Sequence, residues 1–188
     1  SNQQKEADEL DLYIDFRSLG IDKDKFIKGI FSYEALWLAD NASPDNPEYI
    51  FMRQYAEKIQ ENWVPYTALR PNQLGGWSSV TPTQNLVNAY WTVEGKAPIV
   101  LTPEKRKSAY NTIKADLDGY LGVKGNTYSG FVESKIKDGT LKNYEYIKEF
   151  RNRDSRLYAS VMLPFKGWFE TNFGESFYYQ WLKGVGNE

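Results

Sequence analysis

The chain has 188 residues, a formal net charge of -2 at pH 7 and a sequence pI near 5.4. This length suits one domain with a buried core, so residues 1–188 are expected to form a single domain. The mild negative charge provides no basic stripe for nucleic acid, and the longest apolar runs are too short to span a bilayer. These properties argue against nucleic-acid binding and against a membrane-spanning chain.

The sequence contains no cysteine and no histidine. It therefore has no thiol nucleophile, no Ser-His-Asp triad, no zinc site of the usual kind and no disulfide. Carboxylate or calcium chemistry remains among the common catalytic routes, and binding without a reaction is the simplest alternative. No cofactor is expected.

Aromatic residues are the positive compositional signal, with six Trp, 14 Tyr and ten Phe making up 16% of the chain. Many of these rings must belong to the core. Tyr and Trp also suit wet binding surfaces, because one ring face stacks while the heteroatom forms a hydrogen bond. Sugar rings present C–H faces to such platforms, so the composition is compatible with glycan binding.

The first half of the chain alternates apolar clusters with turn-rich segments. Apolar residues gather at 10–16, where Gly20 closes the cluster, and again at 23–37. Residues 40–47 form an Asn-, Asp- and Pro-rich loop, for which a solvated turn is favoured over a calcium site because the EF-hand pattern is absent. Residues 49–55 are predicted to form a strand. Residues 56–74 form a long irregular segment that carries Trp63, Tyr66 and Arg70. A loop of this length with several aromatic residues favours a functional role for the segment.

A helix is predicted to begin near Thr81 and to end by Gly95. Thr81 is a candidate N-cap, Pro82 then occupies the first helical position, and Gln84 stands where it can complete a capping box. The apolar face of this helix is expected to consist of Leu86, Val87 and Tyr90.

Short strands and helices are predicted to alternate through the second half of the chain. Thr102-Pro103 begins a helix whose apolar face repeats at three- and four-residue steps until Gly122. That face comprises Ala109, Tyr110, Ile113, Leu117, Tyr120 and Leu121. The other expected elements are a brief strand at 97–101, a short helix at 131–137, a helical face formed by Tyr144, Ile147 and Phe150, an alternating strand over 157–163 and a strand-like segment at 177–181.

Three arginines, Arg151, Arg153 and Arg156, surround Asp154. One interpretation is a grip for an anion or ligand. The alternative is a structural ion-pair network in which Asp154 neutralises the neighbouring guanidinium groups. The structural alternative is favoured, because arginine is the usual choice for partly buried ion pairs.

Two segments, in this order, resemble the SusD/RagB family of bacterial outer-membrane glycan-binding lipoproteins. The first runs from Gly75-Gly76-Trp77 through Pro-Thr-Gln-Asn-Leu-Val-Asn-Ala-Tyr (residues 82–90) to Gly95-Lys96, and the second is Arg-Asn-Arg-Asp-Ser-Arg-Leu (residues 151–157). Ser155 replaces the family's usual Pro, and Asn85 and Asn88 replace residues that are often acidic. Seven of the residues that carry the resemblance are expected to have a structural role: Gly76, Pro82, Thr83, Gln84, Arg153, Asp154 and Arg156.

The resemblance implies a fold, a function and a location. The expected fold class is α+β, mainly α-helical with short strands and long loops, corresponding to a SusD-like middle and C-terminal region without the helical-repeat scaffold. It implies an internal fragment or a short relative. The implied function is non-enzymatic binding of oligosaccharide or polysaccharide for delivery to a SusC-like TonB-dependent transporter. The full-length protein would be lipid-anchored at the outer-membrane surface, although this chain carries no anchor.

The residues nominated for glycan contact come from the chain itself, because neither family motif specifies a contact. Trp63, Tyr66, Trp77 and Trp91 are the candidate stacking platforms, and Asn72 and Gln73 are the candidate hydroxyl partners. For each aromatic ring the alternative is a structural role in the core. Two other functions remain open for the chain: a structural or protein-interaction module, and a glycosidase that uses two carboxylates.

Overall fold

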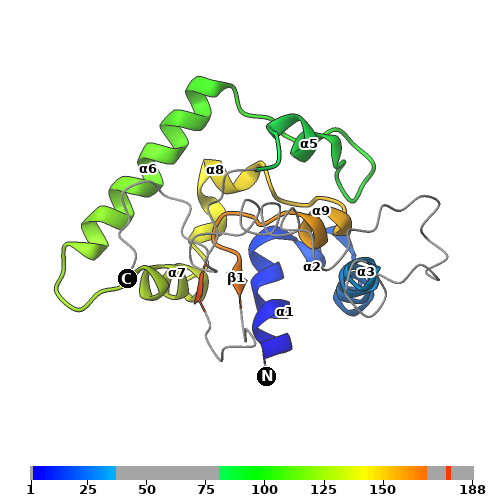
Figure 1. The fold of residues 1–188 in the computed structure, drawn as a ribbon, viewed down its shortest axis with the longest axis horizontal. Helices are drawn as coiled ribbons and strands as arrows, with labels where there is room; N and C mark the ends of the chain where they lie inside the picture. Colours follow the sequence, from blue (N-terminus) through cyan, green and yellow to red (C-terminus); the bar gives the residue numbers. More distant parts are fainter. Residues whose placement is uncertain (1, 37–80, 169–176, 179–188) are drawn as a thin grey trace, which may run out of the picture.

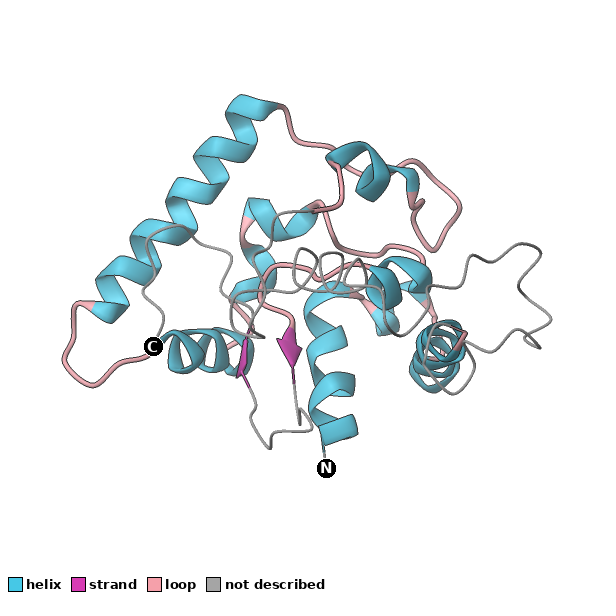
Figure 2. Cartoon of the chain, in the orientation of Figure 1, coloured by secondary structure: helices cyan, strands magenta, loops and turns pink. Residues whose placement is uncertain are grey.

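The computed structural model describes residues 2–36, 81–168 and 177–178, and these residues are mostly helical (Figure 2). The helices are α1 (Asn2–Tyr13), α2 (Phe16–Leu19), α3 (Lys23–Ala35), α5 (Gln84–Ala89), α6 (Pro103–Leu121), α7 (Tyr128–Lys137), the 3₁₀ turn η3 (Leu141–Asn143), α8 (Glu145–Lys148) and α9 (Ser155–Ser160). Strands β1 (Gly167–Trp168) and β2 (Phe177–Tyr178) pair in antiparallel fashion, with Gly167 opposite Tyr178. The expectation of a mainly helical chain is confirmed.

The long helix α6 follows its sequence signals closely. The Thr102 side chain caps it by accepting a hydrogen bond from the Lys105 amide at 3.3 Å, and Pro103 occupies the first turn. Ala109, Ile113 and Leu117 form its buried face. These three residues recur at four-residue steps, as expected for one face of a helix. The predicted helix and its predicted face are confirmed.

The core joins both halves of the described chain. Figure 1 shows α6 along one side of the molecule and α3 at the opposite side, with α1, α8 and α9 between them. The least exposed apolar side chains are Ile113, Leu117, Phe131, Val132, Leu141, Ile147, Leu157, Leu163 and Phe165. These residues come from five helical elements and the segment after α9. Leu12 and Tyr13 of α1 and Ile30 of α3 belong to the same cluster, so the fold depends on contacts between distant parts of the sequence.

Aromatic rings tie α9 to the N-terminal helices. The Tyr158 ring lies 5.6 Å from the Tyr13 ring and 5.9 Å from the Phe26 ring, measured between centroids. Gly29 of α3 lies next to Ser155 of α9: a Cβ atom added at Gly29 would lie 3.5 Å from the Ser155 hydroxyl, an ordinary van der Waals distance. The first apolar cluster is therefore part of the core, and Gly20 ends α2 in the left-handed conformation, with φ of 64°.

The helix predicted to begin at Thr81 is shorter than expected. Helix α5 spans only Gln84–Ala89, and its N-cap is Thr83, whose hydroxyl accepts a hydrogen bond from the Leu86 amide at 3.3 Å. Because Thr83 supplies the cap, Gln84 becomes the first helical residue and closes no capping box. The predicted apolar face is correct for the buried Val87, but Leu86 is 49% exposed.

Two predicted strands are wrong. Residues 157–163 alternate in polarity, yet Ser155–Ser160 forms α9, because Asp154 caps the helix and α9 packs against α3. Residues 97–101 form no strand, and the Leu101 amide donates to the Glu149 side chain instead of to a neighbouring strand. The helix predicted at 131–137 is present as α7, three residues longer at its start. The strand predicted at 49–55 lies outside the described residues.

Candidate functional site

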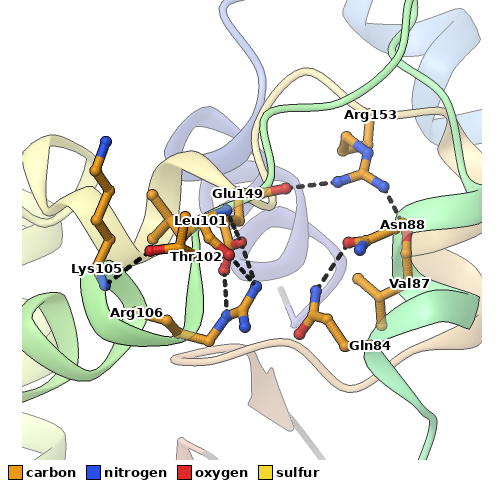
Figure 3. Close-up of polar contacts among 9 residues, drawn as sticks. All are labelled: Gln84, Val87, Asn88, Leu101, Thr102, Lys105, Arg106, Glu149 and Arg153. Atoms are coloured by element: carbon orange, nitrogen blue, oxygen red, sulfur yellow. Dashed lines mark hydrogen bonds and ion pairs between the residues drawn. The ribbon is translucent and has the colours of Figure 1, made fainter.

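Arg153 joins the two sequence motifs at the centre of the site. Its side chain is 1% exposed, and all of its hydrogen bonds go to main-chain carbonyls. Nε donates to the Tyr90 carbonyl at 2.8 Å, Nη1 donates to the Glu149 carbonyl at 2.6 Å, and Nη2 donates to the Val87 and Tyr90 carbonyls. Figure 3 shows the bonds to Glu149 and Val87. Val87 and Tyr90 lie at the end of α5, where the last helical carbonyls have few intrahelical donors; the Val87 carbonyl also accepts from the Tyr90 amide at 3.4 Å. Arg153 therefore caps α5 and fastens it to the residue that follows α8.

The main chains of the two motifs also pair with each other. Thr92 pairs with Arg153 in antiparallel fashion, the Asp154 amide donates to the Trp91 carbonyl at 2.9 Å, and the Val93 amide donates to the Asn152 carbonyl at 2.9 Å. The residues on both sides of Trp91 are thus fixed to the second motif. Burial lowers the pKa of Arg153, as expected for a cation surrounded by neutral groups.

Trp91 is fixed through its main chain while its side chain faces solvent. It is 59% exposed, among the most exposed large apolar residues of the described chain. An indole attached to a fixed backbone can offer a ring face to a ligand with little loss of conformational freedom on binding. The site therefore presents an exposed aromatic surface next to the junction of the two motifs.

The second motif is fastened to the N-terminal helices by Asn152. The Asn152 amide donates to the Tyr13 carbonyl at 2.7 Å, and its side-chain oxygen accepts a hydrogen bond from the Asp15 amide at 2.9 Å. Its φ of 55° lies in the left-handed region, which asparagine tolerates better than most residues. Arg151 forms an ion pair with Asp15 beside it. These contacts set the position of Arg153 relative to the core.

Asp154 pairs with only one of the three arginines around it. Both of its carboxylate oxygens accept from Arg156, at 2.8 and 2.9 Å. This hydrogen bonding lowers the pKa of Asp154. Arg151 pairs with Asp15 and Arg153 with carbonyls, so the described contacts occupy each arginine with the protein itself. Ser155, which stands where the family has Pro, is the first residue of α9, a position that Pro also tolerates well.

A second polar group lies between α5 and the start of α6. Arg106 donates from Nε and Nη2 to the two carboxylate oxygens of Glu149, at 2.9 and 2.7 Å, and Figure 3 shows this fork. The Glu149 side chain is 2% exposed, and the bond to it raises the pKa of Arg106. On α5, the Gln84 side chain donates to the Asn88 side-chain oxygen at 2.9 Å. Arg153 connects α5 to this pair through Val87 and Glu149.

A half-open cavity of about 80 Å³ lies between α1 and α3, with Tyr158 in its lining. Its walls are largely apolar, from Leu10, Ile27 and Ile30 among others. Its polar groups are used within the protein: Glu9 accepts from the Gly167 amide at 2.8 Å, and Lys166 donates to the Tyr158 carbonyl at 2.7 Å. The cavity contains no residue that the sequence nominated for binding.

Of the residues nominated from the sequence for glycan contact, Trp91 alone falls within the described chain. Pro82 and Thr83 are exposed and Gln84 is half-buried at the start of α5. The nominated residues outside the described ranges are Trp63, Tyr66, Asn72, Gln73, Gly76 and Trp77. Sequence reasoning did not nominate Arg106, Glu149 or Asn88, and no local signal pairs Arg106 with a carboxylate 43 positions away.

Neither a metal site nor a membrane span emerges from the described part of the chain. No three Asp or Glu side chains gather there in a way that could hold a metal ion. None of its helices combines the length and the apolar character needed to cross a membrane.

Sequence comparison identifies the class of protein. The sequence model described as the SusD family matches residues 33–187, which include both motifs and the elements joined by Arg153. The chain belongs to the SusD family. No curated protein and no solved structure matches it.

Membership of the SusD family carries general expectations about function. Proteins of this family generally bind glycans without catalysing a reaction, take part in nutrient uptake with SusC-like transporters, and are surface lipoproteins of the outer membrane.

Proposed function

We propose that this chain binds oligosaccharide or polysaccharide at the cell surface, without cleaving it, for delivery to a SusC-like TonB-dependent transporter. The full-length protein would be lipid-anchored to the outer membrane. Trp91 is proposed as a stacking platform of the glycan site. The observation that carries this proposal is the combination of a fixed backbone and a 59% exposed indole at the junction of the two family motifs.

The chemistry of this surface suits a sugar. An indole stacks on the C–H face of a pyranose ring, and nearby side-chain amides can bond to hydroxyl groups. Stacking together with a few hydrogen bonds gives roughly 4 to 6 kcal/mol, which corresponds to dissociation constants from millimolar to tens of micromolar. Trp63, Tyr66, Trp77, Asn72 and Gln73 remain proposed further contacts.

Isothermal titration against a panel of soluble oligosaccharides tests the proposal. The variant Trp91→Ala is expected to lose about tenfold or more in affinity, which corresponds to roughly 1.4 kcal/mol. Ile99→Ala is the matched control, because Ile99 is also apolar and is 63% exposed. Equal binding by Trp91→Ala and the unmodified chain would remove Trp91 from the site. No heat with any sugar would contradict glycan binding by this chain.

A second candidate is a protein-interaction module of the uptake complex. It is favoured by the exposed apolar residues Ile99 and Val100, which are 63% and 50% exposed in the segment before α6. Aromatic residues are likewise enriched at protein interfaces. If Ile99→Ala weakened association with a SusC-like transporter while sugar binding was unchanged, this second role would be supported.

A further inference from the structure

Two side-chain amides on α5 have hydrogen-bonding capacity that the described protein does not use. The Gln84 Nε2 group donates to the Asn88 Oδ1 atom at 2.9 Å. Gln84 Oε1, an acceptor, and Asn88 Nδ2, a donor, form no hydrogen bond with any described residue. The two residues are four positions apart, so they share one face of the helix. Their mutual bond fixes the orientation of both amides.

Arg106 offers a third unused group. Its Nε and Nη2 atoms are engaged by Glu149 and the Leu101 carbonyl, whereas Nη1 forms no hydrogen bond within the described residues. Because the Glu149 carboxylate is buried and accepts from two guanidinium nitrogens, the plane of the guanidinium is fixed. Nη1 is therefore a donor held in a constant direction.

These three side chains lie at the same junction. Figure 3 shows the Gln84 carboxamide on the side of α5 that faces Arg106. Arg153 holds the two elements together by donating to the Val87 carbonyl on α5 and to the Glu149 carbonyl beside the Arg106 pair. Among the described residues, the one buried side-chain polar atom without a partner is Arg151 Nε, so the unused groups of this cluster are accessible to solvent.

We propose that Gln84, Asn88 and Arg106 form a subsite for the hydroxyl groups of a neutral sugar unit next to Trp91. The amide–guanidinium cluster offers donors from Asn88 and Arg106 and an acceptor from Gln84. A hydroxyl group both donates and accepts, so the hydroxyls of a bound sugar can match both the donors and the acceptor. This inference rests on the proposed glycan-binding function and identifies the polar partners of its aromatic platform.

Two features of the site indicate the size and the charge of the sugar that it would bind. Trp91 follows Asn88 by three residues, so their Cα atoms lie within about 11 Å and one oligosaccharide can reach both side chains. The Glu149 carboxylate neutralises the Arg106 charge, which favours neutral hydroxyls over the carboxylates of acidic sugars. Groups already fixed before binding also lose little conformational freedom when the sugar docks.

The variant Asn88→Asp tests the subsite with little change in shape. Aspartate keeps an oxygen to accept the Gln84 hydrogen bond but replaces the unused Nδ2 donor by an acceptor. The probe is the neutral oligosaccharide that gives the largest heat in the panel of gluco-, galacto-, manno- and xylo-oligosaccharides. We expect its dissociation constant to rise about 5- to 30-fold, the effect of leaving a buried donor or acceptor unpaired in the complex. Gln84→Met, which removes the acceptor, is expected to weaken binding similarly.

Asn85→Asp is the matched control, because Asn85 is exposed on the same helix and undergoes the same chemical change. It should bind as the unmodified chain does. If Trp91→Ala loses binding while Asn88→Asp and Gln84→Met keep it, the subsite is wrong and the proposed function stands. If no oligosaccharide binds the unmodified chain, the proposed function fails and the subsite with it. Tighter binding of an oligogalacturonide than of every neutral sugar would overturn the assignment to neutral units.

Discussion

The Arg153 Nε atom donates to the Tyr90 carbonyl at 2.8 Å and connects the two sequence motifs of this family across 63 positions of chain. Tyr90 is the C-cap residue of α5 and immediately precedes the exposed Trp91, so the bond fixes the main chain from which the indole projects. Arg153 itself is positioned from the opposite side, because its amide donates to the Tyr158 hydroxyl at 3.0 Å within the core. The aromatic surface is thereby coupled to the packing of α9 against α3.

Replacing Arg153 by Met should destabilise the fold strongly. The substitution removes the guanidinium donors from the carbonyls of Tyr90 and Glu149, and leaves the Val87 carbonyl with only the Tyr90 amide at 3.4 Å, at a cost of about 3 kcal/mol or more. For a chain of this size the melting temperature should fall by about 6 to 12 °C in a calorimetric scan. Arg156→Met is the control: this exposed arginine pairs with Asp154, and its loss should cost about 1 kcal/mol or less. Equal melting temperatures for the two variants would contradict the role given to Arg153.

A double-mutant cycle should reveal a coupling free energy between Arg106 and Glu149. Arg106→Met alone leaves a carboxylate that is 2% exposed without its cation, which should cost about 3 to 5 kcal/mol of unfolding free energy. Arg106→Met combined with Glu149→Leu removes both charges and should recover much of that loss. Denaturant titration of the unmodified chain, both single variants and the double variant measures the coupling. A double variant that loses as much as the two single variants added together would show that the pair contributes no coupling energy.

Alkaline pH should destabilise the protein through its buried tyrosines. Burial, followed by the carboxylates of Glu9 and Glu133, raises the pKa of Tyr178 to about 12, against about 10 in an unfolded chain. Burial likewise raises the pKa of Tyr13, whose hydroxyl donates to the Pro164 carbonyl at 2.6 Å. Because the folded state favours the protonated phenols, this contribution to stability is complete below pH 10 and is lost as the pH rises from about 10 to 12.

Tyrosinate absorbance and far-UV circular dichroism, recorded together, check the alkaline prediction. Helical signal should disappear over the same pH interval in which the last tyrosines ionise. The variant Tyr178→Phe should show a smaller loss of unfolding free energy between pH 9 and 11 than the unmodified chain. Complete ionisation of all tyrosines near pH 10, with the helices still intact, would contradict the claim that burial raises the pKa of Tyr13 and Tyr178.

The long helices could be read from the sequence because local signals agreed with tertiary packing. In α6, the Thr102 cap, Pro103 and the buried face of Ile113 and Leu117 all indicate the same element. The shorter elements were less predictable. Leu157, Val161 and Leu163 fit a strand by alternation, but Leu157 and Val161 also fit a helical step of four, and packing of α9 against α3 selects the helix for Ser155–Ser160.

The candidate site was predictable only in part, because contacts between residues distant in the sequence decide its geometry. The exposure of Trp91 depends on which way the chain leaves α5, and Arg153 sets that direction from a distant motif. The sequence placed a carboxylate, Asp154, beside three arginines and suggested a shared ion-pair network. In the structure only Arg156 pairs with Asp154, because the buried carbonyls of the first motif engage Arg153 and Asp15 engages Arg151. Such long-range partners have no periodic signal in the chain.

The indole N–H resonance of Trp91 tests the central claim most directly. In a ¹H–¹⁵N spectrum the six tryptophans of the chain give separate indole signals, and the signal missing from Trp91→Phe identifies Trp91. Titration with the oligosaccharide that binds best should shift this signal progressively until it saturates, with a dissociation constant equal to the calorimetric value. A Trp91 signal that stays in place while calorimetry reports saturable binding would contradict the claim that this exposed ring is part of the glycan site.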